Sequence, residues 1–306
     1  MKKYFIFALA ALTLTFAACG DKGNNPEPPA STDPEGDING NNPEPPAITA
    51  PEGAINGLFT INAYGTRVFF SKGNLQATYD GSWTWSFAEN QWDCIGNQVA
   101  NTAISGNGKV STNGTVDLFG WSTASTYYGI NNSTNNDNYS GKFVDWGDNP
   151  ISNGGNSPYR WRTLKLEEWV YLFCGRTDAA KLFSLGKVNG VNGTILLPDN
   201  WSGEKFDNAA KGLTNQGEFY NYSNGFTFHT YDGDAWDAME KKGAVFLPAA
   251  GYRHGKGVDF VGSNGCYWSA SLDDTRFACY LYFYSSRLDP QHRYNRFLGQ
   301  SVRLVR

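Results

Sequence analysis

Apolar and polar positions alternate most clearly near the C-terminus, in the run Tyr280-Leu281-Tyr282-Phe283-Tyr284. Neighbouring side chains of a strand point to opposite faces. The run therefore predicts a strand with Leu281 and Phe283 in a core and three tyrosines in a row on the outside. A core does not need an exposed row of tyrosines, and such a row is typical of a binding face.

Shorter patterns predict further strands. Segments 59–63 and 67–71 flank a Tyr64-Gly65-Thr66 turn and indicate a hairpin. The chain then has short aromatic islands, such as 83–87 and 117–121, separated by Asn, Gly and Ser, which indicates loops and short strands. We expect the Asn-rich segment 129–141 to form a surface loop.

Two segments have the period of a helix. In 164–176 an apolar face includes Trp169, and Thr163 is the expected N-cap. In 232–242 Trp236 starts a second apolar face. Apolar runs after these helices predict more strands. The order predicts an α+β fold that is loop-rich, with two helices and short, twisted, mainly antiparallel sheets.

The N-terminus has the pattern of an export signal. Lys2 and Lys3 precede an apolar run over 4–16 that is too short to span a bilayer. Phe16-Ala17-Ala18 before Cys19 resembles a bacterial lipobox, so we expect residues 1–18 to be removed and Cys19 to be lipidated. The alternative is an ordinary signal peptide followed by an unmodified cysteine.

Residues 19–57 contain almost no bulky apolar side chains and cannot bury a core. They contain a repeat of 17 residues, because 24–30 returns as 41–47 and 34–40 returns with small changes as 51–57. We expect a disordered, Pro-rich stalk that holds a domain of residues 58–306 away from the membrane.

Composition narrows the classes of function. The formal net charge is −4, which gives no electrostatic footprint for nucleic acid. Hydrophobic residues make up 40 % and suffice for a sizeable core. The spacing of the cysteines after residue 19 does not match a zinc site, and sequence cannot say whether they pair. They are Cys94, Cys174, Cys266 and Cys279.

Residue usage changes abruptly at Cys266. Before it the chain has 14 Lys, 5 Arg and 10 Glu, whereas after it there are 6 Arg and neither Lys nor Glu. The tyrosine-rich strand lies within this unusual segment.

Four motifs resemble the C-type lectin-like fold, in the version shared by formylglycine-generating enzymes and the variable proteins of diversity-generating retroelements. They are RTLKLEEW at 162–169, FLPAAGYR at 246–253, YWSAS at 267–271 and GQSVR at 299–303. Residues 58–306 as a whole resemble exported lipoproteins of this family from Bacteroidetes. The variable proteins are the closer match.

In that family, error-prone copying at adenines turns asparagine AAC codons into NNC codons, which never encode Lys, Glu, Gln, Trp or Met. The resemblance therefore accounts for the residue usage and implies a variable ligand-binding region at about 266–303, with Leu281 and Phe283 as fixed scaffold. A plain aromatic sheet with a chance imbalance of Lys and Arg is the alternative. The implied ligand-binding residues are Arg276, Phe277, Tyr280, Tyr282, Tyr284, Ser286, Arg287, Asp289, His292, Arg293, Tyr294, Asn295, Phe297 and Leu298.

Candidate catalytic and metal-binding patterns are weak. The chain has no cysteine motif that matches the thiol site of formylglycine-generating enzymes and neither calcium-binding triplet of C-type lectins. Asp232, Asp234 and Asp237 fit a helix start better than a calcium loop. Glu167 and Glu168 are adjacent on a helix and so point apart. We expect a protein that is not an enzyme and needs no cofactor or metal.

The sequence thus predicts an adhesin- or receptor-like lipoprotein of the outer membrane, displayed on the cell surface. Its expected partner is a protein or glycan on another cell, a phage or a host surface, with no nucleic acid involved. The alternatives are a pilus-tip or surface-assembly subunit and a carbohydrate-binding accessory protein.

Overall fold

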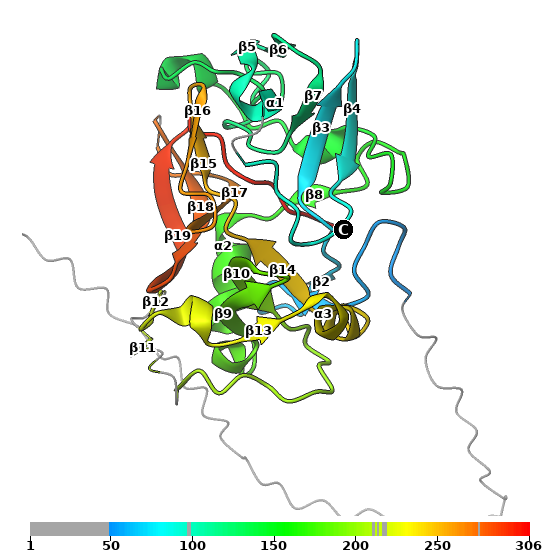
Figure 1. The fold of residues 1–306 in the computed structure, drawn as a ribbon, viewed down its shortest axis with the longest axis vertical. Coiled ribbons are helices and arrows are strands. Elements are labelled where there is room, and N and C mark those ends of the chain that lie inside the picture. Colours follow the sequence, from blue (N-terminus) through cyan, green and yellow to red (C-terminus); the bar gives the residue numbers. More distant parts are fainter. Residues whose placement is uncertain (1–48, 97–98, 210–211, 213, 216–218, 275) are drawn as a thin grey trace, which may run out of the picture. The chain divides into compact units, whose positions relative to one another are not determined.

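The computed structural model describes residues 49–306 except 97–98, 210–211, 213, 216–218 and 275 (Figure 1). The chain divides into two units, Met1–Ala47 and Ile48–Arg306, and the description below concerns the second. The predicted signal peptide, Cys19 and most of the predicted stalk lie outside the described residues. No helix in the described part is long and apolar enough to cross a membrane.

The fold is α+β and consists mostly of short antiparallel sheets with few helices, as predicted. The described residues form three α-helices, α1 (Val99–Thr102), α2 (Leu166–Val170) and α3 (Gly233–Glu240). The four-residue α1 was not predicted, because one turn is too short to show a helical period.

The N-terminal part contains small sheets. The predicted hairpin is confirmed, since β1 (Phe59–Thr60) pairs with β2 (Arg67–Val68). Packing begins ahead of residue 58, because the buried Ile55, predicted to lie in the stalk, donates its N–H to the Phe70 carbonyl over 2.9 Å. The next strands are β3 (Leu75–Tyr79), β4 (Trp83–Phe87) and β7 (Gly114–Val116), which form one sheet, and β5 (Ile104–Gly106) and β6 (Lys109–Val110), which form a hairpin.

A four-stranded sheet occupies the middle of the chain, in the order β13-β9-β10-β14. Its strands are β9 (Phe183–Val188), β10 (Val191–Leu196), β13 (Thr230–Tyr231) and β14 (Val245–Pro248), and only β13 runs parallel to its neighbour. Beside it, the hairpin of β15 (Tyr252–His254) and β16 (Gly257–Asp259) leads into the C-terminal sheet.

The C-terminal sheet has five strands in the order β11-β12-β19-β18-β17. They are β11 (Thr214–Asn215), β12 (Tyr220–Asn221), β17 (Asn264–Leu272), β18 (Phe277–Tyr284) and β19 (Arg287–Asn295). The last strand, β20 (Leu304–Val305), pairs with β8 (Arg162–Thr163). Figure 1 shows the β15–β16 hairpin next to the orange and red strands β17–β19.

One face of the five-stranded sheet packs into the core. Leu281 and Phe283 are fully buried there, together with Tyr267 of β17, Leu288 of β19 and Trp169 of α2. The prediction that Leu281 and Phe283 belong to the core is confirmed. Strand alternation then directs the tyrosines of β18 to the opposite face.

Both predicted helices form, with one correction. Asp232 caps α3 by accepting the Ala235 N–H over 2.8 Å, which supports the interpretation of its acidic residues as a helix start. Thr163 is not the cap of α2, because it lies in β8 and donates its hydroxyl to Asp145 over 2.9 Å. The N-cap is Lys165, and α2 continues as a π-helical turn, Tyr171–Gly175.

The predicted surface loop 129–141 is not entirely on the surface. Its 3-10 turn, Asn136–Tyr139, buries Tyr139 completely, with the hydroxyl 2.9 Å from the Asn131 carbonyl. Asn136 also donates its side-chain amide to the Asn295 side chain over 2.6 Å. The loop is therefore attached to the end of β19.

Candidate ligand-binding site

The face of β17–β19 opposite Leu281 and Phe283 carries a cluster of aromatic side chains and packs in part into a second core, which includes Cys266, Trp268 and Tyr280. Tyr280 lies opposite Trp268 on one side and His292 on the other, while Tyr282 lies opposite Cys266 and Asp289. The register shifts between Tyr280 and Tyr282, so that β18 and β19 have a bulge at this point. Bulges re-aim side chains and are common next to binding sites.

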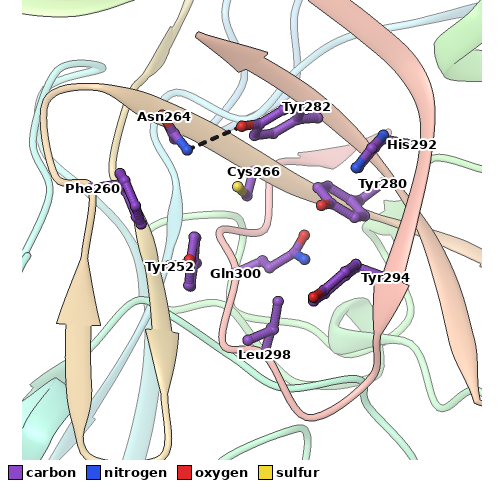
Figure 2. Close-up of a pocket in the computed structure, with 10 residues that line it drawn as sticks. All are labelled: Tyr252, Phe260, Asn264, Cys266, Tyr280, Tyr282, His292, Tyr294, Leu298 and Gln300. Atoms are coloured by element: carbon purple, nitrogen blue, oxygen red, sulfur yellow. Dashed lines mark hydrogen bonds between the residues drawn. The ribbon is translucent and has the colours of Figure 1, made fainter.

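A pocket of about 300 Å³ lies against this face (Figure 2). Strands β17–β19 supply one wall, the β15–β16 hairpin and the residue after it supply another, and the segment between β19 and β20 supplies the rest. The lining residues are Tyr252, Phe260, Asn264, Cys266, Tyr280, Tyr282, His292, Tyr294, Leu298 and Gln300.

Two pairs of stacked rings line the pocket. Tyr252 and Phe260 have ring centroids 5.5 Å apart and planes inclined by 29°. Tyr282 and His292 have centroids 5.0 Å apart and planes inclined by 28°. Tyr280 meets His292 edge to face at 5.2 Å. Flat apolar surfaces therefore lie on both sides of the pocket, and the exposed rings of Phe260 and Tyr294 lie at its rim.

Gln300 is the most unusual lining residue. Its main chain is held by two hydrogen bonds with Phe119, of 2.8 and 2.9 Å, and the residue is fully buried. Its side-chain nitrogen and oxygen have no hydrogen-bond partner among the described residues. Buried polar groups are nearly always hydrogen-bonded, so an amide left unpaired in a pocket indicates a place for a ligand. Figure 2 shows this side chain near the centre of the lining residues.

Asp289 lies behind the aromatic wall and orients two of its neighbours. Its carboxylate accepts hydrogen bonds from Arg287 at 2.8 Å and from the Gln291 N–H at 3.1 Å, and it lies 3.2 Å from Nδ1 of His292. Burial raises the pKa of Asp289, but the bonds from His292, Arg287 and Gln291 outweigh it and hold the pKa below its usual value. Asp289 is therefore ionised at neutral pH and fixes the His292 ring.

Burial keeps the hydroxyls of Tyr252, Tyr280 and Tyr282 and the thiol of Cys266 protonated at physiological pH. Burial raises the pKa of the Tyr282 hydroxyl to about 12 and also raises the pKa of Tyr280 and Tyr252. Burial likewise raises the pKa of the Cys266 thiol, so this sulfur stays protonated and is a poor nucleophile. The pocket can form hydrogen bonds and stack on rings, but it offers no activated nucleophile.

The structure brings five of the fourteen predicted ligand-binding residues together in this pocket. They are Tyr280, Tyr282, His292, Tyr294 and Leu298. An adjoining hollow of about 180 Å³ is lined by Tyr294 and Leu298 together with the predicted Asn295 and Phe297. The convergence of residues from β18, β19 and the following segment defines the candidate site.

The remaining predicted residues line neither hollow. Tyr284 packs on Tyr282 with ring centroids 5.5 Å apart. Arg287 lies over the Phe219 ring at 4.3 Å. At the other end of the sheet, Arg293 pairs with Asp273 at 2.8 Å and Arg276 lies over Phe277 at 5.7 Å. The Ser286 carbonyl accepts the Tyr222 N–H, and Asp289 has the supporting position described above.

The expectation of three fully exposed tyrosines is wrong for Tyr280, which is 5 % exposed, whereas Tyr282 and Tyr284 are half-buried. Their face of the sheet points away from the core around Leu281 and Phe283, but Tyr280 belongs to a second core. Tyr280 packs edge to face on Trp268, and the β15–β16 hairpin and Leu298 lie across the pocket. The tyrosine row is the wall of a pocket rather than a flat outer surface.

Sequence reasoning missed five lining residues, namely Tyr252, Phe260, Asn264, Cys266 and Gln300. Tyr252 and Gln300 do lie inside two of the quoted motifs, but nothing in their spacing showed that the motifs meet. Phe260 has a φ of +59°, which is uncommon for a residue other than glycine, and lies at the turn that ends β16. Its ring is thereby placed beside Tyr252.

The other candidate groups have structural roles. Cys94, Cys174, Cys266 and Cys279 form no disulfide among the described residues. Glu168 accepts two hydrogen bonds from Arg162, at 2.7 and 2.8 Å, and a third from the Lys165 N–H at 2.8 Å, so its carboxylate is committed to the start of α2.

Comparison with known proteins gives no relative. No family model matches this chain, and no curated protein and no solved structure is significantly similar to it. The function is therefore argued from the geometry of the site.

Proposed function

We propose that this protein is a non-catalytic ligand-binding protein that uses the pocket between β17–β19 and the β15–β16 hairpin. The observation that carries the proposal is the convergence of Tyr280, Tyr282, His292, Tyr294 and Leu298, all among the residues that the family resemblance implies, on one aromatic pocket. Tyrosine is a frequent hot-spot residue, because it buries a large area at low cost in side-chain entropy.

We further propose that the fold is C-type lectin-like and that a retroelement diversifies the pocket wall. The two faces of β18 support this idea. Leu281 and Phe283 pack into the core, whereas Tyr282, on the opposite face, lines the pocket. Replacement of Tyr282 then leaves the packing of Leu281 and Phe283 intact, whereas Tyr280 also packs on Trp268 in a second core.

The proposed setting is the outer surface of a bacterial cell. The export signal, the lipobox-like sequence before Cys19 and the Pro-rich segment support a lipoprotein whose binding domain stands away from the outer membrane. A protein or glycan on another cell, a phage or a host surface would be within its reach, and no nucleic acid is involved.

Binding is tested with a panel of immobilised glycans and phage-displayed random peptides. The wild type is compared with a Tyr282→Ala/His292→Ala variant and with Tyr64→Ala as the control, since Tyr64 is 95 % exposed and lies outside the pocket. We expect probes that bind the wild type and the control but not the double variant. A panel in which no probe separates the folded double variant from the wild type would reject the proposal.

Diversification is tested on the gene. The codons for the fourteen predicted residues should have the form NNC, and a near-copy that differs at adenines should lie close to the gene. Other codons at these positions would exclude diversification and leave the binding proposal standing.

A further inference from the structure

We infer that the pocket binds a neutral saccharide ring without a metal ion, and that Gln300 orients this ring. The inference rests on the proposed function, since it assigns a ligand class to the same pocket.

The Gln300 side chain supplies the polar part of the recognition. Its amide presents one donor group and one acceptor side by side, and neither is bonded to the protein among the described residues. Two adjacent hydroxyls of a sugar ring match this pattern, because one can accept from Nε2 while the other donates to Oε1. The Phe119 hydrogen bonds hold the Gln300 main chain in place, and the complete burial of the residue restricts the movement of its side chain.

The aromatic rings supply the apolar part. A pyranose ring has apolar C–H faces and a rim of hydroxyls, which suits a pocket with stacked rings on both sides and polar groups between them. The ring pairs Tyr252–Phe260 and Tyr282–His292 provide the flat surfaces. Asn264 donates to the Tyr282 hydroxyl over 3.1 Å, which leaves the proton of that hydroxyl available to a ligand oxygen.

The charge and size of the pocket favour a neutral sugar over a charged ligand or an extended peptide. None of the ten lining residues is Asp, Glu, Lys or Arg. The volume of about 300 Å³ is at the lower end of the range for small-molecule pockets and suits one ring. Because the available polar groups are amides, hydroxyls and an imidazole, the sugar hydroxyls bond to the protein directly, without a carboxylate-bound cation.

The test uses the methyl glycosides of galactose, mannose and N-acetylglucosamine as separate probes, with N-acetyltyrosine amide as the peptide-like competitor. Binding is measured by calorimetry and by ligand-observed NMR, with and without EDTA. We expect at least one glycoside to bind equally well in EDTA. We also expect Gln300→Met to weaken that binding at least about tenfold, as for the loss of a hydrogen-bonding group.

A matched control and a folding measurement separate recognition from structure. Gln291→Met makes the same change on β19 outside the pocket and should bind as the wild type does. Gln300→Met should keep the thermal midpoint of the wild type, because the lost amide has no protein partner among the described residues. If this variant does not fold, the side-chain amide signals of Gln300 in the wild type provide the test, and they should shift when the glycoside is added.

Three results would overturn the inference. They are glycoside binding that EDTA abolishes, glycoside binding that folded Gln300→Met retains in full, and binding of only the tyrosine amide or displayed peptides. The last result leaves the proposed binding function intact. If no probe distinguished the wild type from the folded Tyr282→Ala/His292→Ala variant, the proposed function itself would be rejected.

Discussion

Tyr282 and His292 stack across β18 and β19, with ring centroids 5.0 Å apart. Side chains in contact do not contribute independently to stability. Asp289 adds a further contact to this pair, because its carboxylate lies 3.2 Å from Nδ1 of His292. The pocket wall is therefore a set of coupled positions.

The coupling of Tyr282 and His292 is measurable. We expect the free energy of unfolding of Tyr282→Ala/His292→Ala to differ from the sum of the single changes by about 0.5–1.5 kcal/mol, the size of an aromatic pair interaction. Urea unfolding of the four proteins of the cycle gives this value. Additivity to within about 0.3 kcal/mol would show that the stack contributes no stability.

Tyr280 and Tyr294 should differ sharply in their effect on folding. Tyr280 is 5 % exposed and packs on Trp268, whereas Tyr294 is 49 % exposed at the rim. We expect Tyr280→Ala to lower the free energy of unfolding by about 3 kcal/mol and Tyr294→Ala by less than about 1 kcal/mol. Equal losses in chemical denaturation would contradict the burial described for Tyr280.

Glu168 and Glu167 provide a second matched pair. Glu168 is bonded to Arg162 and to the Lys165 N–H, whereas Glu167 is exposed and 3.9 Å from the Lys165 ammonium. We expect Glu168→Ala to lower the free energy of unfolding by about 1–2 kcal/mol, as for a lost helix cap with a charged partner. Glu167→Ala should cost less than about 0.5 kcal/mol. The reverse order would show that the carboxylate of Glu168 does not hold the start of α2.

Features that depend on neighbouring residues could be predicted from the sequence, whereas features that depend on contacts between distant segments could not. The burial of Leu281 and Phe283 is a local consequence of strand alternation, so the run itself revealed it. The burial of Tyr280 depends on a distant segment, because the β15–β16 hairpin is held by the bonds between Arg253 and Gly299, of 2.7 and 2.8 Å. Such contacts leave no periodic trace in either segment.

The same reasoning explains Gln300 and Thr163. Gln300 is placed in the pocket by its main-chain hydrogen bonds with Phe119, which is far away in the chain. The motif that contains Gln300 did not by itself indicate a binding role. Thr163 is of a residue type that is common at N-caps, but its hydroxyl donates a hydrogen bond to Asp145. In both cases a tertiary hydrogen bond decides the role of a side chain that local pattern left open.

Asp117 gives the protein a pH dependence that differs in sign from that of Asp289. Asp117 is buried and accepts hydrogen bonds from the Ile95 N–H and the Asn101 side chain, each at 2.7 Å. Burial is the largest effect and raises its pKa from the ordinary value of 3.8 to about 6, against these hydrogen bonds. The folded protein therefore holds this proton at a pH where the unfolded chain has lost it.

For a raised pKa, the contribution of Asp117 to stability is complete below about pH 4 and is lost as the pH rises through about 6. The loss corresponds to about 3 kcal/mol. Asp289, whose pKa is lowered, contributes in the opposite sense and loses its contribution as the pH falls. Unfolding free energies from pH 4 to 7 should therefore decline more for the wild type than for Asp117→Asn, which cannot titrate. A ¹³C-detected titration midpoint of the Asp117 carboxyl near pH 6 supports this assignment, and a midpoint below 4 would refute it.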